Sequence, residues 1–385
     1  MKKEDKIGNI VMVATYLVMG FGAGVLLVDF ANPDGQSFPA YLGRILFGVA
    51  LLYGAILVQI ILHEGGHLIG GLLSGYRFVS FRIGSFLWLK QGKKIVLRRF
   101  SLTGTAGQCL LEPPQWNDGI PFVLYNLGGA LMNFLSASLS GALAVLCPSG
   151  SPGRLLFGVL ALAGFGIAFT NGLPLHVGGV DNDGMNLLSL GTNKAALRAF
   201  QIQMLLNKAI GEGVRLRDMP AEWFPLPDDE AMKNSMTATL EVFRCNRLLD
   251  EHRFSEAAEA MSTVIHGDNA VLGIHKNLLI CDRILCEVLE ENRPEVLAEL
   301  ATKRLYTFFK TMKNNPSILR TEFILALFLE KDREKAEKIK ESFERAVKNY
   351  PYAGEMEGEA EFLALLEKRA SEEEKKACIP PDKVV

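Results

Sequence analysis

The pentapeptide His63-Glu64-Gly65-Gly66-His67 carries the residue types of a hydrolytic metal site. On a helix, side chains four positions apart lie on one face, so His63 and His67 can bind one metal ion together. Zinc binds imidazole nitrogen well and keeps an open position for water at catalytic sites. Glu64 is adjacent to the first histidine and can reach that water as a general base. The motif therefore predicts a zinc-dependent hydrolase with Glu64 as its catalytic residue.

Two histidines leave a zinc site incomplete, so we expect a third ligand elsewhere in the chain. The best candidates follow the last long apolar stretch, where the polar segments 171–174 and 181–184 contain two aspartates. The same segments would also suit a turn that caps the next helix, because Asn, Asp and Gly are common there. Either Asp181 or Asp183 could supply that ligand.

Four apolar stretches are long enough to cross a membrane, which takes about 20 residues. The histidine motif lies in the second stretch, behind the uncharged run 45–62. Ionisable side chains inside a membrane span are costly and are functional by default. The metal site is therefore expected within a membrane domain. The four stretches run from Ile7 to Phe30, from Tyr41 to Leu73, from Pro121 to Leu146 and from Leu155 to Thr170.

The distribution of lysines and arginines between the loops predicts which side of the membrane each loop faces. Residues 76–118 contain seven of them, whereas the loops 31–43 and 147–153 contain none. The positive-inside rule makes residues 76–118 cytoplasmic, and an even number of spans then puts both termini on the same side. A helix rises about 28 Å from Arg44 to His63, so the motif lies toward the cytoplasmic face. We expect a multi-pass protein of a prokaryotic cell membrane, because no targeting signal is recognisable.

Two segments outside the apolar stretches predict further structure: a β-hairpin before residue 103 and a helical region beyond residue 210. Residues rich in Phe, Ile, Val and Leu flank a turn at 91–93 and predict a small β-hairpin over about 77–102. Glycines in 104–108 suggest that the backbone there lies close to another part of the protein. Beyond residue 210 the chain is charged and helix-forming. Its segments 248–253 and 328–333 are similar and lie 80 residues apart, which suits two periods of a helix-pair repeat of about 40 residues.

Composition sets the fold class and excludes some functions. The chain has 385 residues, 49% hydrophobic, with a net charge of −2, which argues against nucleic-acid binding. Its six cysteines form no Cys-x-x-Cys pair and are predicted to be free thiols. We predict a mainly α protein: a polytopic membrane helix bundle with a small β-hairpin insertion over residues 1–210, and a soluble, cytoplasmic helical domain over 211–385. That domain resembles tetratricopeptide-type helical hairpins, although it lacks their diagnostic Trp and Gly positions.

Three motifs together resemble the site-2 protease family of intramembrane metallopeptidases, over about residues 40–190. The family combines the HExxH motif in one span with a Gly-x-x-x-Asn pattern in the next, matched here by Gly129 and Asn133. A later Asn-x-x-Pro…Asp-Gly segment is matched by 171–174 and 183–184. The family places its ligand aspartate eight residues after the asparagine, and that position here is Gly179. We favour Asp183 as the ligand, because Gly184 completes the Asp-Gly pair of the family motif, and keep Asp181 as the alternative.

The resemblance implies Zn²⁺ bound by two histidines and an aspartate, with glutamate as the base. It also implies that Asn171 hydrogen-bonds the substrate backbone, and it assigns Gly129 and Asn133 to the substrate-binding region. In the family, the β-hairpin after the HExxH helix pairs with extended substrate. The segment 77–102 would suit that role.

We therefore predict an intramembrane zinc metalloprotease that cleaves membrane-tethered proteins or peptides near the cytoplasmic face of the lipid bilayer. Its helical domain would select substrate or bind a protein partner. The alternative is a catalytically weak or inactive membrane scaffold whose helical domain binds partners. Zinc transport is disfavoured, because no second ionisable cluster marks a path across the bilayer.

Overall fold

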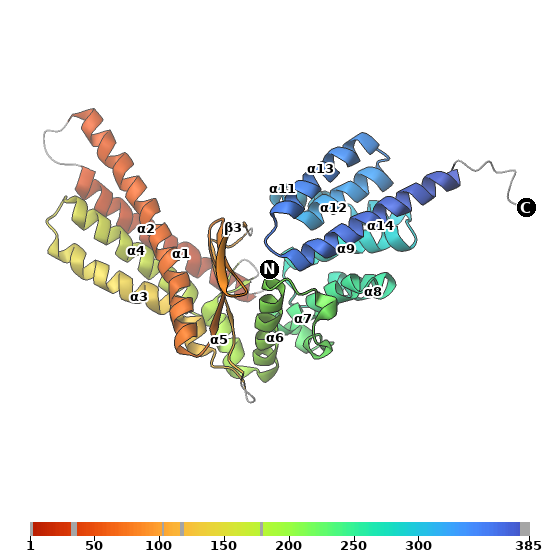
Figure 1. Cartoon of the computed structure of the whole chain (residues 1–385). Coiled ribbons are helices and arrows are strands. Elements are labelled where there is room, and N and C mark those ends of the chain that lie inside the picture. The colour runs from red at the N-terminus through yellow and green to blue at the C-terminus, as the bar shows by residue number, and fades with distance from the viewer. Residues whose placement is uncertain (1–2, 32–36, 102–103, 116–118, 178–179, 378–385) are drawn as a thin grey trace, which may run out of the picture. The chain divides into compact units, whose positions relative to one another are not determined.

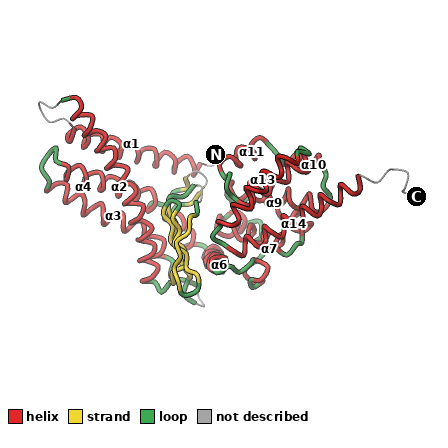
Figure 2. Tube along the Cα trace, turned by 45° about the horizontal axis from the view of Figure 1, so that its top comes forward, coloured by secondary structure: helices red, strands yellow, loops and turns green. Residues whose placement is uncertain are grey.

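The computed structural model describes residues 3–31, 37–101, 104–115, 119–177 and 180–377. These residues are mostly helical and include a small antiparallel sheet (Figures 1 and 2). Two compact units can be separated: the first comprises 1–88 and 105–201, and the second comprises 89–104 and 202–385.

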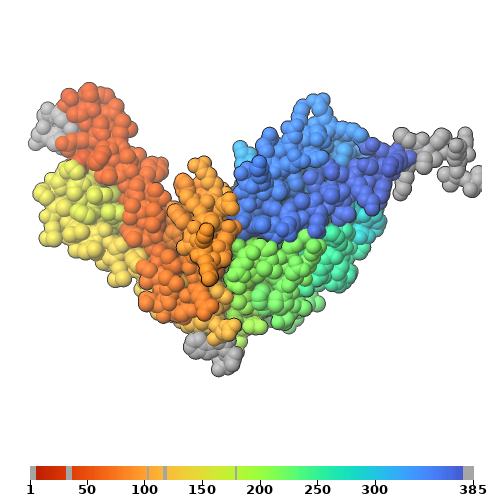
Figure 3. All heavy atoms as spheres, viewed as in Figure 1, coloured from red at the N-terminus to blue at the C-terminus, as the bar shows by residue number. Residues whose placement is uncertain are grey.

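Four helices of the first unit are long and apolar enough to cross a membrane. Many of their outward side chains are apolar and exposed; Phe21, for example, is 77% exposed and Leu139 is 64% exposed. In Figure 3 this outer surface is coloured red to yellow. An apolar surface of this extent is typical of lipid contact and supports the prediction of a membrane protein. The helices are α1 (Lys3–Ala31), α2 (Phe38–Leu73), α3 (Val123–Leu146) and α4 (Pro152–Gly172).

Glycines let α2 and α3 cross at very short distance. A Cβ atom added to Gly66 would overlap the backbone oxygen of Gly128, and one added to Gly128 would overlap that of Gly66. A Cβ on Gly70 would likewise overlap the backbone of Leu124. Small residues four positions apart commonly allow such close crossings between membrane helices. The half of α2 that carries the histidines is thereby held against α3.

The region predicted as a β-hairpin forms three strands of a four-stranded sheet with the order β3-β2-β1-β4. The segment 77–90, expected as one strand, is broken at Gly84, whose φ of +56° makes a tight turn. The fourth strand was not predicted, because it pairs with β1 across a long separation in sequence, with Ile83 opposite Gly107. Residue 102 of the predicted hairpin lies outside the described residues. The strands are β1 (Arg77–Ile83), β2 (Phe86–Gln91), β3 (Lys94–Arg99) and β4 (Gly107–Glu112).

Beyond α4, a two-stranded ribbon and a short helix complete the surroundings of the histidine motif. The ribbon pairs β5 (His176–Val177) with β6 (Val180–Asp181), and α5 (Asp183–Thr192) follows at once. Helix α5 packs against α3 and α4. Helix α6 (Lys194–Gly211) then leads from the first unit into the second.

The second unit contains a helical array around one apolar core. Three left-handed residues, His252, Asn292 and Lys331, mark tight corners between successive helical segments. The array is helical as predicted, whereas its repeat character stays a prediction. The helices are α7 (Ser235–Asp250), α8 (Phe254–His266), α9 (Gly273–Glu290), α10 (Pro294–Leu300), α11 (Lys303–Thr311), α12 (Pro316–Ile324), α13 (Arg333–Asn349) and α14 (Ala353–Ala377), with a π-helical turn at Leu325–Leu329 before α13.

Candidate metal centre

Helix α2 positions the two histidines and the glutamate. His63, Glu64 and His67 are all buried, each at most 9% exposed. The two histidines lie one helical turn apart on the face that meets α3, and their Nε2 atoms are 3.1 Å apart. The spacing in the sequence therefore has the predicted consequence: both imidazoles reach the same point.

Asp183 joins the histidines. Its Oδ2 atom lies 3.1 Å from Nε2 of His63 and 3.3 Å from Nε2 of His67. Asp181, the rival candidate, instead lies 2.6 Å from Nδ1 of His176 across the β5–β6 ribbon. The structure thus brings Asp183 to the histidines and directs Asp181 to a different partner.

The turn before α5 explains this choice. Asn182 caps the helix by accepting a hydrogen bond from the backbone N–H of Met185, and its amide donates to the backbone oxygens of Thr170 and Leu173. These bonds fasten the start of α5 to the end of α4. A Cβ on Gly184 would come within 2.7 Å of the backbone of Leu173, so only glycine fits there. Asp183 is held between Asn182 and Gly184 as the first residue of α5.

Hydrogen bonds behind the histidines fix which nitrogen faces Asp183. Nδ1 of His67 lies 2.7 Å from the backbone oxygen of Tyr125, which can only accept, so this nitrogen carries the proton. Nδ1 of His63 lies 2.7 Å from Oδ1 of Asn133. In a neutral imidazole the other nitrogen is then unprotonated. Both Nε2 atoms therefore present lone pairs.

The orientation of Asn133 is itself determined by its neighbours. Its amide nitrogen donates to the backbone oxygen and to Oε1 of Gln59, at 2.7 and 2.8 Å, so its Oδ1 must face His63. Gln59 in turn donates to the backbone oxygen of Leu160. Both amide side chains are fully buried. This chain of bonds across α2, α3 and α4 sets the tautomer and orientation of one imidazole, as outer partners of metal-bound histidines commonly do.

With both imidazoles neutral, as metal binding requires, three acceptor atoms converge with no proton between them. A tetrahedral zinc ion with bonds of about 2.0–2.1 Å keeps its ligand atoms about 3.3 Å apart, which is close to the observed 3.1–3.3 Å. Among the described residues, Oδ2 of Asp183 has no hydrogen-bond donor although it is buried. Facing lone pairs of this kind repel one another unless a cation lies between them. The donor set of two imidazoles and one carboxylate fits zinc and leaves a fourth position open.

Glu64 lies beside this centre without belonging to it. The group that could hold a metal contains His63, His67 and Asp183, and Glu64 is not part of it. The carboxylate packs against the start of β4, where a Cβ on Gly107 would lie 2.5 Å from Oε1 of Glu64. The prediction of a close backbone approach by the glycines in 104–108 is thereby confirmed at Gly107.

Arg82 holds that strand in place. The side chain, 1% exposed, donates to the backbone oxygens of Gly84 and Gly107 and to the hydroxyl and backbone oxygen of Thr105. It thereby joins the end of β1 to the residues that enter β4 opposite Glu64. An individual role for Arg82 could not be predicted, because nothing local distinguishes it from the other basic residues of 76–118.

The residues assigned to substrate binding have varied surroundings. Gly129 lies against both imidazoles, since a Cβ there would be 2.6 Å from Nε2 of His67 and from Cε1 of His63. Asn133 is buried behind His63, as described above. Asn171 donates to the backbone oxygen of Ile167 within α4. Their contacts with substrate stay a prediction.

A comparison with models of known families, with curated proteins and with solved structures finds no match. The function is therefore inferred from the residues themselves.

Proposed function

We propose that the chain is an intramembrane zinc metalloprotease, similar to the site-2 proteases, that hydrolyses peptide bonds of membrane-tethered proteins near the cytoplasmic face. The observation that carries this proposal is the convergence of His63, His67 and Asp183, with both Nδ1 atoms already hydrogen-bonded to acceptors. Such an arrangement inside an apolar helix would be strongly unfavourable without a function.

His63, His67 and Asp183 would hold the metal, and the bound Zn²⁺ would polarise the scissile carbonyl and lower the pKa of a water molecule. Glu64 would take one proton from that water as its oxygen bonds to the carbonyl carbon. As the C–N bond breaks, Glu64 would return the proton to the leaving nitrogen, so that an amine and a carboxylic acid result, and the acid then ionises by losing its proton to solvent. Glu64 can act as general base because it is not one of the three converging metal ligands.

The β4 strand offers a way to place an extended substrate. It is an edge strand of the sheet, and its first residue, Gly107, packs on Glu64. An edge strand can pair with an added extended peptide through backbone hydrogen bonds. A peptide paired there would pass close to the proposed base, in keeping with the substrate pairing that the resemblance implies.

The test compares the zinc content of purified wild type, Asp183→Ala, Asp181→Ala and Glu64→Gln, together with cleavage of unfolded casein in detergent. We expect about one zinc per chain in wild type, Asp181→Ala and Glu64→Gln, and a loss of zinc in Asp183→Ala. Cleavage should fall by at least about 100-fold in Glu64→Gln, in line with the contribution of a general base. A folded wild type that binds no zinc would overturn the proposal. Bound zinc with equal cleavage in wild type and Glu64→Gln would favour the scaffold alternative.

A further inference from the structure

Strand β4 is attached to the membrane helices at three alternate residues. Gly107, at its start, packs on the proposed general base. Leu111 fills the space beside Gly71 of α2, where an added Cβ would overlap its Cδ1 atom. Between these two contacts, the backbone oxygen of Cys109 accepts a hydrogen bond of 2.7 Å from the hydroxyl of Tyr125 on α3. The strand is therefore held by two packing contacts and one directional bond.

The same tyrosine also holds one of the converging histidines. Its backbone oxygen lies 2.7 Å from Nδ1 of His67, and its ring centroid lies 5.9 Å from that of the imidazole. Tyr125 thus connects two parts of the candidate site through separate atoms. The backbone oxygen orients His67, and the side-chain hydroxyl holds the strand at Cys109. One residue of α3 consequently sets the position of β4 relative to the histidine.

Aromatic contacts fix the direction of the Tyr125 hydroxyl. Tyr76 stacks on the ring, with centroids 5.4 Å apart and an angle of 6° between the planes. Phe200 of α6 lies against the ring with a centroid distance of 6.0 Å, in addition to the contact with His67. Tyr76 is itself only 3% exposed. A side chain locked by such packing keeps its hydrogen bond in one geometry, as the support of a functional site requires.

Packing contacts alone would not fix the strand along its own axis. Apolar contacts such as that of Leu111 are non-directional, whereas a hydrogen bond weakens steeply once its angle or length departs from the preferred values. A substrate paired with β4 moves together with the strand. A misplacement of about 1 Å at the reacting carbonyl can cost about 100-fold in rate. Loss of the hydroxyl is therefore expected to affect catalysis more than folding.

We propose that Tyr125 is a positioning residue whose hydroxyl fixes strand β4, and with it the paired substrate, relative to His67 and the metal centre. This inference rests on the proposed function, which assigns β4 to the substrate and His67 to zinc. A purely structural role would lower the amount of folded, zinc-loaded protein. A positioning role instead leaves a folded, zinc-loaded protein that cleaves slowly and offers neighbouring peptide bonds of the substrate to the site.

The test compares purified wild type with Tyr125→Phe in detergent, with unfolded casein as the substrate. The substitution removes the hydroxyl and keeps the ring and the backbone oxygen. We expect kcat to fall at least about tenfold, while KM and zinc content change less than about threefold. Mass spectrometry of the products should show cleavage at peptide bonds next to those that wild type cleaves. Tyr53→Phe, on α2 and 72% exposed, is the control for the loss of a hydroxyl and should match wild type.

Hydrogen exchange provides a readout that needs no cleavage. The amides of β4 should exchange at least about tenfold faster in Tyr125→Phe than in wild type, whereas those of α3 should not change. Unchanged exchange in β4, or unchanged kcat and cleavage positions, would overturn the proposal. A loss of zinc in proportion to the loss of activity would also overturn it. A wild type without zinc or cleavage would instead refute the proposed function, and the exchange rates would still decide whether Tyr125 fixes the strand.

Discussion

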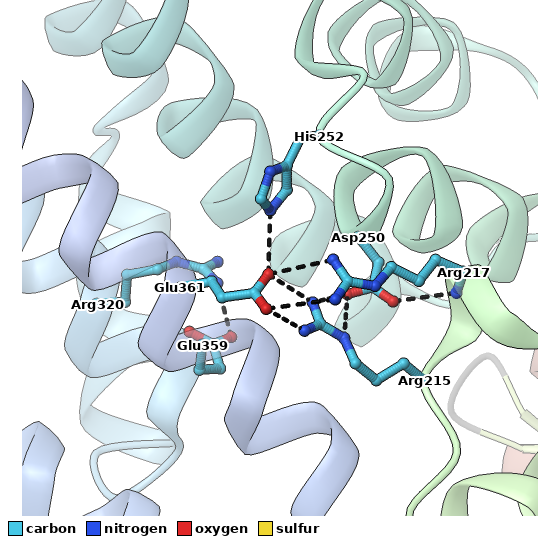
Figure 4. A network of polar contacts seen from close by, with 7 residues as sticks. All are labelled: Arg215, Arg217, Asp250, His252, Arg320, Glu359 and Glu361. Atoms are coloured by element: carbon cyan, nitrogen blue, oxygen red, sulfur yellow. Dashed lines mark hydrogen bonds and ion pairs between the residues drawn. The ribbon is translucent and has the colours of Figure 1, made fainter.

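The two units bury polar groups in opposite ways. In the first unit, His63, His67 and Asp183 turn three atoms toward one point, and all three are acceptors when the imidazoles are neutral. In the second unit, the Arg320 guanidinium lies between Asp282 and Glu359, so that donors face acceptors, as Figure 4 shows for Glu359. The chain pairs the charges of the second cluster by itself, whereas under the proposed function a metal ion completes the first. We therefore expect a ligand where buried acceptors face one another, and a structural role where a buried cation lies between two carboxylates.

The largest expected effect distinguishes these two kinds of cluster directly. Arg320→Met leaves Asp282 and Glu359 buried without their cation, so we expect the free energy of unfolding to fall by about 3–5 kcal/mol. Asp183→Asn in the zinc-free protein, measured at a pH at which both imidazoles are neutral, removes one of three mutually repelling acceptors, so the unfolding temperature should stay equal or rise. Thermal unfolding in detergent with a chelator measures both. Arg345→Met, exposed on α13, is the control for loss of an arginine. A comparable loss in both variants would mean that the first cluster is also closed within the chain.

The second prediction concerns the backbone that brings the acceptors together. Gly65 and Gly66 are adjacent, but a Cβ on Gly65 would meet nothing within 4 Å, whereas one on Gly66 would overlap Gly128. We expect Gly66→Ala to destabilise the protein by about 1–3 kcal/mol through overpacking and to lower its zinc content. Gly65→Ala should be neutral or stabilising by up to about 1 kcal/mol, because alanine favours the helix. Equal unfolding temperatures for the two variants would contradict the close crossing of α2 and α3.

The third prediction tests whether the amide network serves the metal. Asn133→Leu removes the acceptor of His63 Nδ1, so the imidazole loses its fixed tautomer, and we expect zinc affinity to fall about 10–100-fold. Asn126→Leu is the matched control: Asn126 is buried on the same helix but donates to the backbone oxygen of Phe122. Competition with a zinc-binding dye measures both affinities. An unchanged zinc affinity in Asn133→Leu would show that the hydrogen bonds of Asn133 do not contribute to metal binding.

The sequence predicted best what is local along the chain. The spacing of His63 and His67 requires only a helix, and the apolar stretches require only length, so the four membrane-length helices end within a few residues of the predicted ends. The sequence did not decide which of Asp181 and Asp183 lies beside the histidines. That depends on the β5–β6 ribbon, in which Asp181 faces His176.

Residues that act through distant partners were harder to find. Gln59 had a usable signal, because it is a polar residue in an apolar span one turn before His63, and such residues rarely lack a role. Arg82 and the strand β4 had none, since their partners are assembled by pairing across the sheet. The cluster around Arg320 is built from three helices far apart in sequence and could not be predicted either.

The smallest expected effect is a pH dependence of the closed charges in the second unit. Glu287 is buried and bonded to Arg293 and Arg283, and Arg293 in particular holds its pKa at about 2. A carboxylate with a lowered pKa in the folded state stabilises the fold above its unfolded pKa of about 4.5, and this contribution is lost as the pH falls toward 2. Glu287→Gln should therefore lower the unfolding temperature at pH 7, by an amount equivalent to about 1–2 kcal/mol, and the difference from wild type should shrink steadily between pH 4.5 and pH 2. Glu299→Gln, at an exposed position of α10, should show no difference at any pH. A constant deficit in Glu287→Gln across this range would mean that the ion pairs contribute nothing and that the substitution acts through packing alone.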